Sequence, residues 1–179
     1  MSRLYPLVRK SHEMDEEDVQ AARALLWDVF GSEMTEDDWE HCLGGVHALV
    51  WDRGELIGHG SVIHRRLRHA GRALETGYVE GLAVRADRRG EGHGASMMAA
   101  LEAVVRGNYE LGALSSTEPA ASFYASRGWR LWKGPSSVLS PRGIEPTPED
   151  DGGIFVLTVS TPVDTRGELT CDWRAGDLW

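Results

Sequence analysis

The sequence predicts an α/β (α+β) protein with a single mixed β-sheet, in one domain that spans residues 1–179. Two observations set the frame: the chain has 179 residues, and 41% of them are hydrophobic while 26% are charged. A chain of this length and composition forms one globular domain whose core needs no disulfide or metal. The third observation is the order of the expected elements, strands first and then strand–helix–strand–helix–strand, which is typical of a mixed sheet.

The first half of the chain shows one strand, two helices and three further strands. Residues 2–10 alternate as an opening strand does, and apolar residues recur at helical spacing from Asp15 to Phe30. Thr35-Glu36-Asp37-Asp38 is typical of a capping box, which predicts a short helix through Cys42. The strand-like runs that follow are residues 46–51, 56–68 and 73–84.

The second half alternates helices and strands. The expected elements are a helix over 95–106, a strand over 110–115 and a helix that begins at Thr117-Glu118-Pro119 and ends at Gly128. Beyond it lie the segment 129–139, a loop rich in proline, glycine and acidic residues at 141–153, a strand over 154–160 and a polar tail.

The charge balance is acidic. The chain has 28 Asp and Glu against 19 Lys and Arg, a formal net charge of −9. This balance argues against a nucleic-acid partner, which requires a basic face, and against an anionic membrane surface. It points weakly toward a cationic partner, and from composition alone solubility is the favoured explanation.

The sequence shows no targeting segment and only two isolated cysteines, and we therefore expect a cytoplasmic chain. The first eighteen residues hold no apolar run long enough for a signal peptide, and no stretch reaches the ~18 apolar residues of a membrane helix. Cys42 and Cys171 are isolated and match no metal or disulfide spacing, so we expect thiols.

Residue spacing excludes one enzyme class and argues against another. The lysines, Lys10 and Lys133, do not lie in a Walker-type loop, which excludes a P-loop nucleotide enzyme. The seven histidines are scattered, and His64 and His69 have no cysteine or carboxylate at metal-ligand spacing, so we expect no metal.

A glycine-rich loop, RGEGHGA at residues 89–95, joins an expected strand to a helix. Gly90, Gly92 and Ala95 formally satisfy the dinucleotide fingerprint, and Glu110 lies at about the right distance. The context excludes that fold, because Glu110 opens a strand rather than closing one, and at least three strands precede the loop. Converging backbone N–H groups and a helix N-terminus can still hold a pyrophosphate; the alternative is an ordinary turn.

Two segments carry a family resemblance. GYVEGLAVRADRRGEGHG (residues 77–94) precedes an apolar helix and contains Arg89-x-x-Gly92-x-Gly94; ASFYASRGW follows at residues 121–129. In this order and spacing they resemble the acetyl-CoA-binding core of the GCN5-related N-acetyltransferases (GNAT). The resemblance implies a single GNAT acetyltransferase domain, with a mixed, mostly antiparallel central sheet flanked by about four helices. It also implies acetyl-CoA as co-substrate.

A narrower resemblance runs from about residue 30 to the last residue. The segments DWEHCLGGVHA (38–48), YELGALSS (109–116) and CDWRAGDLW (171–179), with residues 77–84, are similar to the aminoglycoside 2'-N-acetyltransferases. The terminal nonapeptide is the most specific, because tails seldom match by chance. The resemblance implies acetylation of the 2'-amino group of aminoglycosides, and hence antibiotic resistance. Related enzymes are often homodimers.

Glu80 is the candidate general base. It alternates with Tyr78, Leu82 and Val84 on one strand face, and partial burial among apolar neighbours would raise its pKa. It could then take a proton from an ammonium group directly or through water; the alternative is a half-exposed strand glutamate. Gly81 permits a bulge, which the superfamily uses to open the sheet at the acetyl group.

Tyr124 is the candidate general acid. The resemblance gives it protonation of the coenzyme A thiolate, and the alternative is a core aromatic ring whose hydroxyl lies at the surface. Backbone N–H groups of residues 82–84 would polarise the thioester carbonyl, and the glycine loop would hold the pyrophosphate. The implied cofactor-binding residues are Leu82, Ala83, Val84, Arg89, Gly90, Glu91, Gly92, His93, Gly94 and Ala95.

An aminoglycoside carries several ammonium groups, so its site needs dispersed carboxylates and carbonyls. By resemblance these are Glu33, Asp38, Glu80, Gly81, Ser115, Asp150, Asp177 and Trp179. The alternatives are a helix N-terminus favoured by residues 36–38, a solvated loop at 148–152 and a frayed tail. The family pattern has Gly-Asp-aromatic where this chain has Gly31-Ser32-Glu33-Met34, which keeps the carboxylate but changes its placement.

The surplus charge has a local prediction. Residues 31–40 hold five acids, residues 145–151 hold four, and neither stretch holds a base. We expect them to converge with Asp177 on one cleft for a polycation. Two other functions stay open: acetylation of another amine, such as an amino sugar, polyamine or peptide, and a non-catalytic acyl-CoA-binding module.

Overall fold

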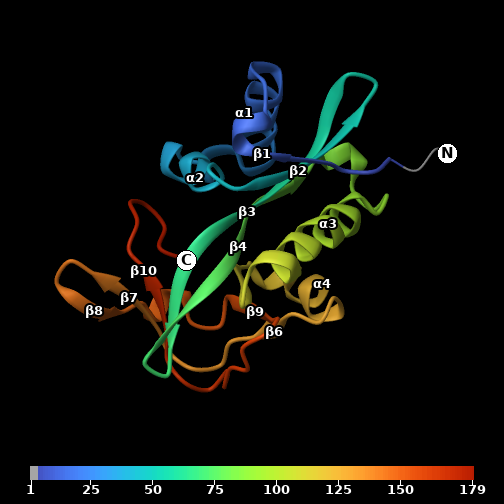
Figure 1. Ribbon diagram of the computed structural model, residues 1–179. Helices are drawn as coiled ribbons and strands as arrows, with labels where there is room; N and C mark the ends of the chain where they lie inside the picture. The colour runs from blue at the N-terminus through green and yellow to red at the C-terminus, as the bar shows by residue number, and fades with distance from the viewer. Residues whose placement is uncertain (1–3) are drawn as a thin grey trace. The chain divides into compact units, whose positions relative to one another are not determined.

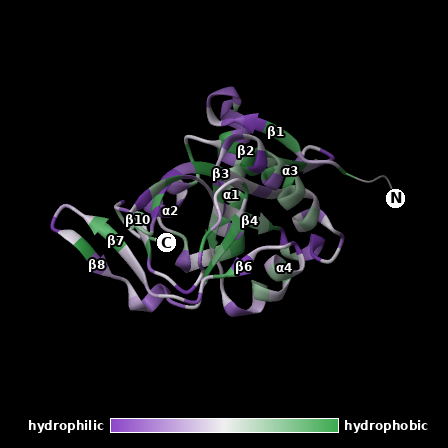
Figure 2. Ribbon diagram, turned by 60° about the horizontal axis from the view of Figure 1, so that its bottom comes forward, coloured by the Kyte–Doolittle hydropathy of each residue, from purple (hydrophilic) through white to green (hydrophobic). Residues whose placement is uncertain are grey.

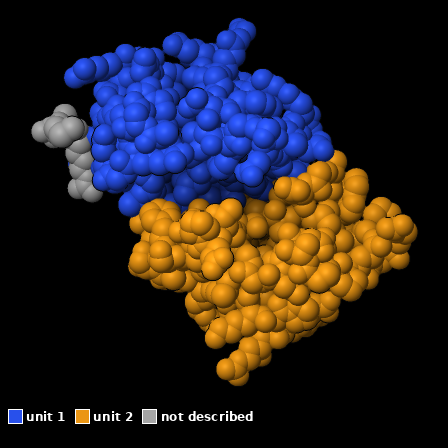
Figure 3. All heavy atoms as spheres, turned by 180° about the vertical axis from the view of Figure 1, so that it is seen from behind, with its two compact units in different colours: residues 1–63, 79–104 blue, residues 64–78, 105–179 orange. Residues whose placement is uncertain are grey.

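The computed structural model describes residues 4–179, which divide into two compact units (Figure 3). Unit 1 comprises residues up to 63 and 79–104, and unit 2 comprises residues 64–78 and 105–179. Within residues 4–179, none of the helices combines the length and apolarity that a membrane span requires.

The described residues form ten strands and four α-helices, with short 3-10 turns between some of them (Figure 1). The helices are α1 (Glu16–Phe30), α2 (Glu36–His41), α3 (His93–Asn108) and α4 (Ala121–Ser126). The strands are β1 (Leu7–Lys10), β2 (Val46–Asp52), β3 (Glu55–His69), β4 (Arg72–Val84), β5 (Leu111–Ser115), β6 (Arg130–Leu131), β7 (Ser136–Ser140), β8 (Gly143–Pro146), β9 (Ile154–Thr158) and β10 (Leu169–Asp172).

The sheet is mixed, as the sequence predicts. Its strand order is β6-β9-β5-β4-β3-β10-β7-β8, and β2 pairs with both β3 and β1 off this path. The pairs β4–β5 and β10–β7 are parallel, whereas β1–β2, β2–β3, β3–β10, β5–β9, β6–β9 and β7–β8 are antiparallel. The expected fold class, a mostly antiparallel mixed sheet with about four helices, is confirmed.

The two N-terminal helices of unit 1 form where their capping residues predict. Asp15 accepts a hydrogen bond from the Asp18 N–H at 2.9 Å and caps α1. Thr35 and Asp38 form a reciprocal capping box at the start of α2. Both helices contribute apolar side chains to one buried cluster with β2 and β3, whose members include Leu25, Leu26, Trp39, Leu49 and Leu56.

The strands of unit 1 lie close to their expected limits. Arg53 and Gly54, both with positive φ, turn the chain from β2 into β3. The opening strand begins only at Leu7, so the prediction of a strand over residues 2–10 is too long; residues 2 and 3 lie outside the described part. Helix α3 begins at His93, two residues before the expected start.

Unit 2 holds the parallel pairing. Thr76–Tyr78 of β4 pair with residues 111–113 of β5, which pairs antiparallel with β9. Gly77 is required there, because a Cβ atom would lie 2.7 Å from the Tyr109 ring. The strands β5 and β9 are almost entirely buried, and β4 is largely apolar in Figure 2.

Three expectations for unit 2 are corrected. The helix predicted from Thr117 to Gly128 is a 3-10 turn at Glu118–Ala120 followed by the six-residue α4. The loop predicted at 141–153 contains β8 and a 3-10 turn at Pro148–Asp150. The polar tail contains β10, which lies between β3 and β7. These strands have four residues each, too few for a periodic pattern, and depend on pairing with neighbours.

Candidate active site

Glu80 and Gly81 lie in the part of β4 that belongs to unit 1. Glu80 is partly buried, and its backbone carbonyl accepts a hydrogen bond from the Ser61 hydroxyl at 3.4 Å. Gly81 has φ +55°, and a Cβ atom there would lie 2.6 Å from Cys42 Sγ. This backbone departs from extended strand geometry and admits only glycine, as the expected bulge would need.

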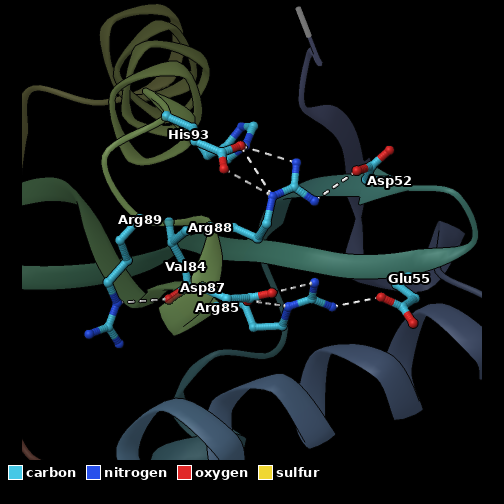
Figure 4. Close-up of polar contacts among 9 residues, drawn as sticks. Asp52, Glu55, Val84, Arg85, Asp87, Arg88, Arg89 and His93 are labelled. Carbon is cyan, nitrogen blue, oxygen red and sulfur yellow. Dashed lines mark hydrogen bonds and ion pairs between the residues drawn. The ribbon is translucent and has the colours of Figure 1, made fainter. Parts of the chain in front are cut away.

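The glycine loop follows directly and is held by ion pairs (Figure 4). Arg88 Nη1 lies 2.7 Å from Asp52 Oδ2, and Arg88 Nη2 lies 3.1 Å from Glu91 Oε2. His93 Nε2 lies 3.1 Å from the same Glu91 oxygen. Hydrogen bonds from His93 and Arg88 lower the pKa of Glu91. The Glu91 side chain therefore anchors the loop, so any cofactor contact of this residue falls to its backbone.

The exposed face of the loop is open. Gly90 and Gly92 have φ of +79° and +86°, and nothing lies within 4 Å of a Cβ atom built on either. Arg89 is exposed, donates from Nε to the Val84 carbonyl at 3.2 Å, and points away from the Arg88 ion pairs in Figure 4. The first turn of α3 starts here, with Ser96 N–H bonded to Gly92 O. Such a loop and helix N-terminus fit a pyrophosphate group.

Tyr124 lies on α4 in unit 2 and is 8% exposed. Its ring contacts Phe123, Trp129 and Phe155, with centroids 5.2 to 6.4 Å apart. Burial raises the pKa of Tyr124 to about 12. The phenol is therefore protonated at neutral pH, which is the state a general acid needs.

An acidic pocket of about 520 Å³ lies in unit 2 beside the end of β5. Its lining includes Ser115 and four carboxylates, Glu118, Glu149, Asp150 and Asp151, and none of its lining residues is basic. Partial burial, with the charges of Glu149, Asp177 and Asp151, raises the pKa of Asp150 to about 6. The pocket thus brings together two of the expected substrate residues, Ser115 and Asp150, and the charge of Asp177 acts on Asp150 from outside the lining. A cationic ligand would relieve the repulsion among these carboxylates.

The C-terminus is docked onto the segment that carries Asp150. Trp179 is 6% exposed, and its indole Nε1–H donates to Thr147 Oγ1 at 2.9 Å. Thr147 in turn bonds Ser136, whose backbone N–H and hydroxyl both donate to Asp151 Oδ1. The frayed-tail alternative is therefore wrong for Trp179.

A buried arginine supports the same tail, and sequence reasoning missed it. Arg65 is 3% exposed and donates to Asp172 Oδ1 and to the Leu178 carbonyl, both at 2.8 Å. The sequence feature that could have indicated Arg65 is its position on the inward face of a strand that contains several arginines. Asp177, by contrast, is exposed, and its backbone carbonyl accepts from Arg174.

The remaining expected substrate residues belong to unit 1. Glu33 is exposed in a 3-10 turn, and both bonds that Asp38 accepts in the capping box go to its Oδ2 atom. For Asp38 the helix-capping alternative is thus confirmed, and a role in binding stays a prediction.

The sequence did not predict that His47 and His59 lie together, because the seven histidines are scattered along the chain. His59 and His47 are fully buried and bonded to each other, and His59 bonds the Gly81 carbonyl. Among residues 4–179, no group of three or more His, Cys, Asp or Glu is placed to hold a metal ion.

Comparison with known proteins gives concordant matches. A family model described as an acetyltransferase (GNAT) domain matches residues 10–132. An aminoglycoside 2'-N-acetyltransferase from Mycolicibacterium fortuitum is 48% identical over 171 residues, which cover 93% of this chain and 88% of that protein.

Solved structures share the fold at low sequence identity. A GNAT family N-acetyltransferase (YhbS) from Escherichia coli in complex with CoA has a TM-score of 0.66 and 17% identity, covering 96% of this chain and 92% of its own. A GNAT family acetyltransferase from Brucella melitensis in complex with acetyl-CoA has a TM-score of 0.62 and 15% identity, covering 96% and 97%.

Proposed function

Because the chain belongs to the GNAT acetyltransferase family and, within it, to the family of aminoglycoside 2'-N-acetyltransferases, we propose that it acetylates the 2'-amino group of aminoglycosides with acetyl-CoA. Family membership confirms both resemblances drawn from the sequence and makes the chain an acetyltransferase. We propose further that residues 1–179 act as one acetyltransferase domain, in the cytoplasm and without a metal.

The acidic pocket of unit 2 carries the substrate proposal. An aminoglycoside presents several ammonium groups, and each partly solvated ammonium–carboxylate pair contributes about 0.2–1 kcal/mol. Partial burial, together with the charges of Glu149 and Asp177, destabilises the charged form of Asp150. A polycation would bind these carboxylates and restore full ionisation of Asp150. Ser115 adds a hydroxyl for a sugar, and Glu33 and Asp38 stay predicted contacts for further amines.

For the co-substrate, we assign the pyrophosphate to the backbone of residues 89–95 and the positive end of α3. The open positions above Gly90 and Gly92 support this, since neither position has a side chain that would exclude an anion. The pantetheine arm would pair with the main chain of residues 82–84, which leads directly into the loop.

The chemistry needs a neutral amine and a protonated leaving group. Glu80 would accept a proton from the 2'-ammonium, directly or through water, and the amine nitrogen would attack the thioester carbonyl carbon. The new C–N bond forms as the C–S bond breaks, and the Tyr124 phenol donates its proton to the departing thiolate. The nitrogen then gives up its second proton, which restores the phenol, and Glu80 releases the first proton to solvent. The balance is ammonium plus thioester giving amide, thiol and one proton released to solvent.

Thiol release with acetyl-CoA tests the proposal directly. The acceptors are gentamicin, tobramycin and kasugamycin, with streptomycin as the negative control because it lacks the 2'-amino-sugar arrangement. We expect turnover with at least one 2'-amino compound and an N-acetyl group at the 2' position by NMR. Absence of turnover with all three would exclude the proposal; turnover of spermidine, another amino sugar or a peptide instead would favour the alternative acceptor class.

The base is tested by Glu80→Gln, with Glu75→Gln as the matched control. Glu75 is the other glutamate of β4 and is paired with Arg66 in unit 2. We expect kcat to fall about 100-fold for Glu80→Gln and less than twofold for the control, in line with typical losses of a general base. Binding of both substrates with no turnover by the wild type would instead indicate the acyl-CoA-binding module. Sizing of the purified chain tests the expected homodimer.

A further inference from the structure

A line of hydrogen bonds crosses the interior of unit 1 and ends on the carbonyl of Gly81, the residue after Glu80. His59 Nδ1 lies 2.8 Å from the Gly81 carbonyl oxygen, and His59 Nε2 lies 3.0 Å from His47 Nδ1. His47 Nε2 lies 2.7 Å from Ser11 Oγ. Both imidazoles are 0% exposed, whereas Ser11 is partly exposed. The line therefore connects the surface to the strand that carries the candidate base.

The Gly81 carbonyl at the end of this line determines which ring nitrogen of each histidine carries the hydrogen. A carbonyl oxygen can only accept, so His59 carries its hydrogen on Nδ1 and accepts on Nε2. His47 must then donate from Nδ1, and its Nε2 accepts the Ser11 hydroxyl proton, at a shorter distance than the 3.3 Å contact from that hydroxyl to Gly45 O. Burial lowers the pKa of both histidines to about 4, so both rings are neutral at physiological pH.

The backbone closes the far end of the line. Ser11 Oγ accepts from the N–H groups of Gly44 and Gly45 at 2.9 and 3.1 Å. All three side chains are thus satisfied, and all their dipoles point the same way. A buried polar group costs free energy wherever a bond is missing, and aligned bonds strengthen one another.

The acceptor of this line belongs to a particular peptide group. The Gly81 carbonyl and the Leu82 N–H are two ends of one amide, and the Leu82 N–H begins the backbone stretch assigned to the thioester carbonyl. A hydrogen bond on the carbonyl oxygen draws electron density from the amide nitrogen and makes its N–H a stronger donor. Gly81 has φ +55°, so the backbone departs from regular strand geometry at this peptide.

We propose that His59, supported by His47 and Ser11, is a positioning residue that orients and polarises the Gly81–Leu82 peptide, so that the Leu82 N–H stabilises the negative charge developing on the thioester oxygen. The inference rests on the proposed acetyl transfer. Neither histidine touches substrate in this scheme; each acts through the backbone. An apolar pair of the same volume as His47 and His59 could fill this space but could not donate a hydrogen bond to the Gly81 carbonyl.

Kinetics separate this role from simple packing. His59→Leu removes the donor to Gly81, whereas His59→Asn keeps one, since its Nδ2 replaces the imidazole Nδ1. Loss of a complete oxyanion donor costs about 10²–10³ in kcat; a weakened donor should cost about tenfold. We therefore expect kcat to fall about tenfold in His59→Leu and no more than about threefold in His59→Asn. The KM for the aminoglycoside should change less than twofold in both.

Val50→Ala is the control for packing, because Val50 is fully buried in β2 and makes no bond in this line. It should lower the melting temperature and leave kcat within twofold. Unchanged kcat in folded His59→Leu, or an equal loss in His59→Asn and His59→Leu, would overturn the inference. A wild type that turns over no 2'-amino acceptor would instead refute the proposed function.

Nitrogen-15 NMR of histidine-labelled wild-type protein tests the predicted tautomers of His47 and His59 even where a variant does not fold. We expect both His47 and His59 as neutral Nδ1–H tautomers from pH 6 to pH 8. Ser11→Ala, at the partly exposed end, should shift the Leu82 amide proton upfield. An Nε2–H tautomer at either histidine, or no change of the Leu82 amide in Ser11→Ala, would contradict the proposed line.

Discussion

Asp150→Asn should stabilise the fold while weakening the substrate site. Asp150 has an elevated pKa because its charged form is partly buried and lies among Glu149, Asp177 and Asp151. An amide of nearly equal shape removes that charge. A carboxyl whose folded pKa exceeds its unfolded value destabilises the fold once it ionises, so the cost is absent below the unfolded pKa and complete above the folded one.

The magnitude follows from the size of that shift. A rise of the pKa from 3.8 to about 6 would correspond to about 3 kcal/mol at full strength. Because Asp150 is only partly buried, solvent screening leaves about 1 kcal/mol. For a chain of this length that difference raises the melting temperature by about 2–4 °C. The gain should develop between pH 4 and pH 6 and be roughly half complete at pH 5.

Thermal unfolding at pH 5 and pH 8 measures the gain, and steady-state kinetics measures the KM for tobramycin. The control is Glu145→Gln, which makes the same chemical change at a carboxylate whose pKa is lowered by bonds from Ser140 and Arg142. The control should not gain stability at either pH. For Asp150→Asn we expect KM to rise about three- to fivefold, as one partly solvated pair predicts. A melting temperature at pH 8 equal to or below the wild type, or a gain that does not grow with pH, would refute the reasoning.

Three further substitutions test other parts of unit 2. Tyr124→Phe should lower kcat about 100-fold with little change in stability. The control Tyr109→Phe removes a phenol outside the site and should leave kcat unchanged. Equal kcat values for Tyr124→Phe and the wild type would exclude Tyr124 as the general acid. Trp179→Ala should reduce the free energy of unfolding by about 3 kcal/mol in denaturant titrations, and a neutral result would mean that the terminal indole is not docked in solution. Arg65→Leu leaves Asp172 and the Leu178 carbonyl without their donor and should cost about 3 kcal/mol; a loss below about 1 kcal/mol would contradict the assigned contacts.

Local signals predicted the elements that depend on local physics. The caps Asp15 and Thr35 set the starts of α1 and α2 within a residue, since a side-chain bond to the next turn needs no distant partner. Strands β8 and β10 were missed because each has four residues and depends on pairing with chain far away in sequence. Leu169 of β10 faces His69 of β3 and Ser136 of β7, a register that no pattern within the tail could show.

The residues of the candidate site likewise fall into those that a local motif predicts and those that only the fold brings together. Glu80, Tyr124 and the glycine loop lie in contiguous motifs, so a resemblance could point to them. The pair of His47 and His59 could not be anticipated, because their contact depends on the register that sets Leu49 opposite His59 and His47 opposite Ser61. Two histidines twelve residues apart are scattered in sequence and adjacent in an antiparallel pair.

The structure also changes how the acidic surplus should be counted. Of the four acids in residues 145–151, Glu145 is paired with Arg142, and Asp151 accepts two bonds from Ser136. The carboxylates left to attract a cation are Glu149 and Asp150, together with Asp177. Within residues 4–179, no basic side chain is among the groups that shift the pKa of Asp150. Binding of an ammonium group should therefore draw a proton off Asp150, and affinity for the polycation should rise between pH 5 and pH 7. The net charge shows only that the chain is acidic. Among the described residues, the carboxylates that have no cationic partner indicate where a cationic substrate would bind.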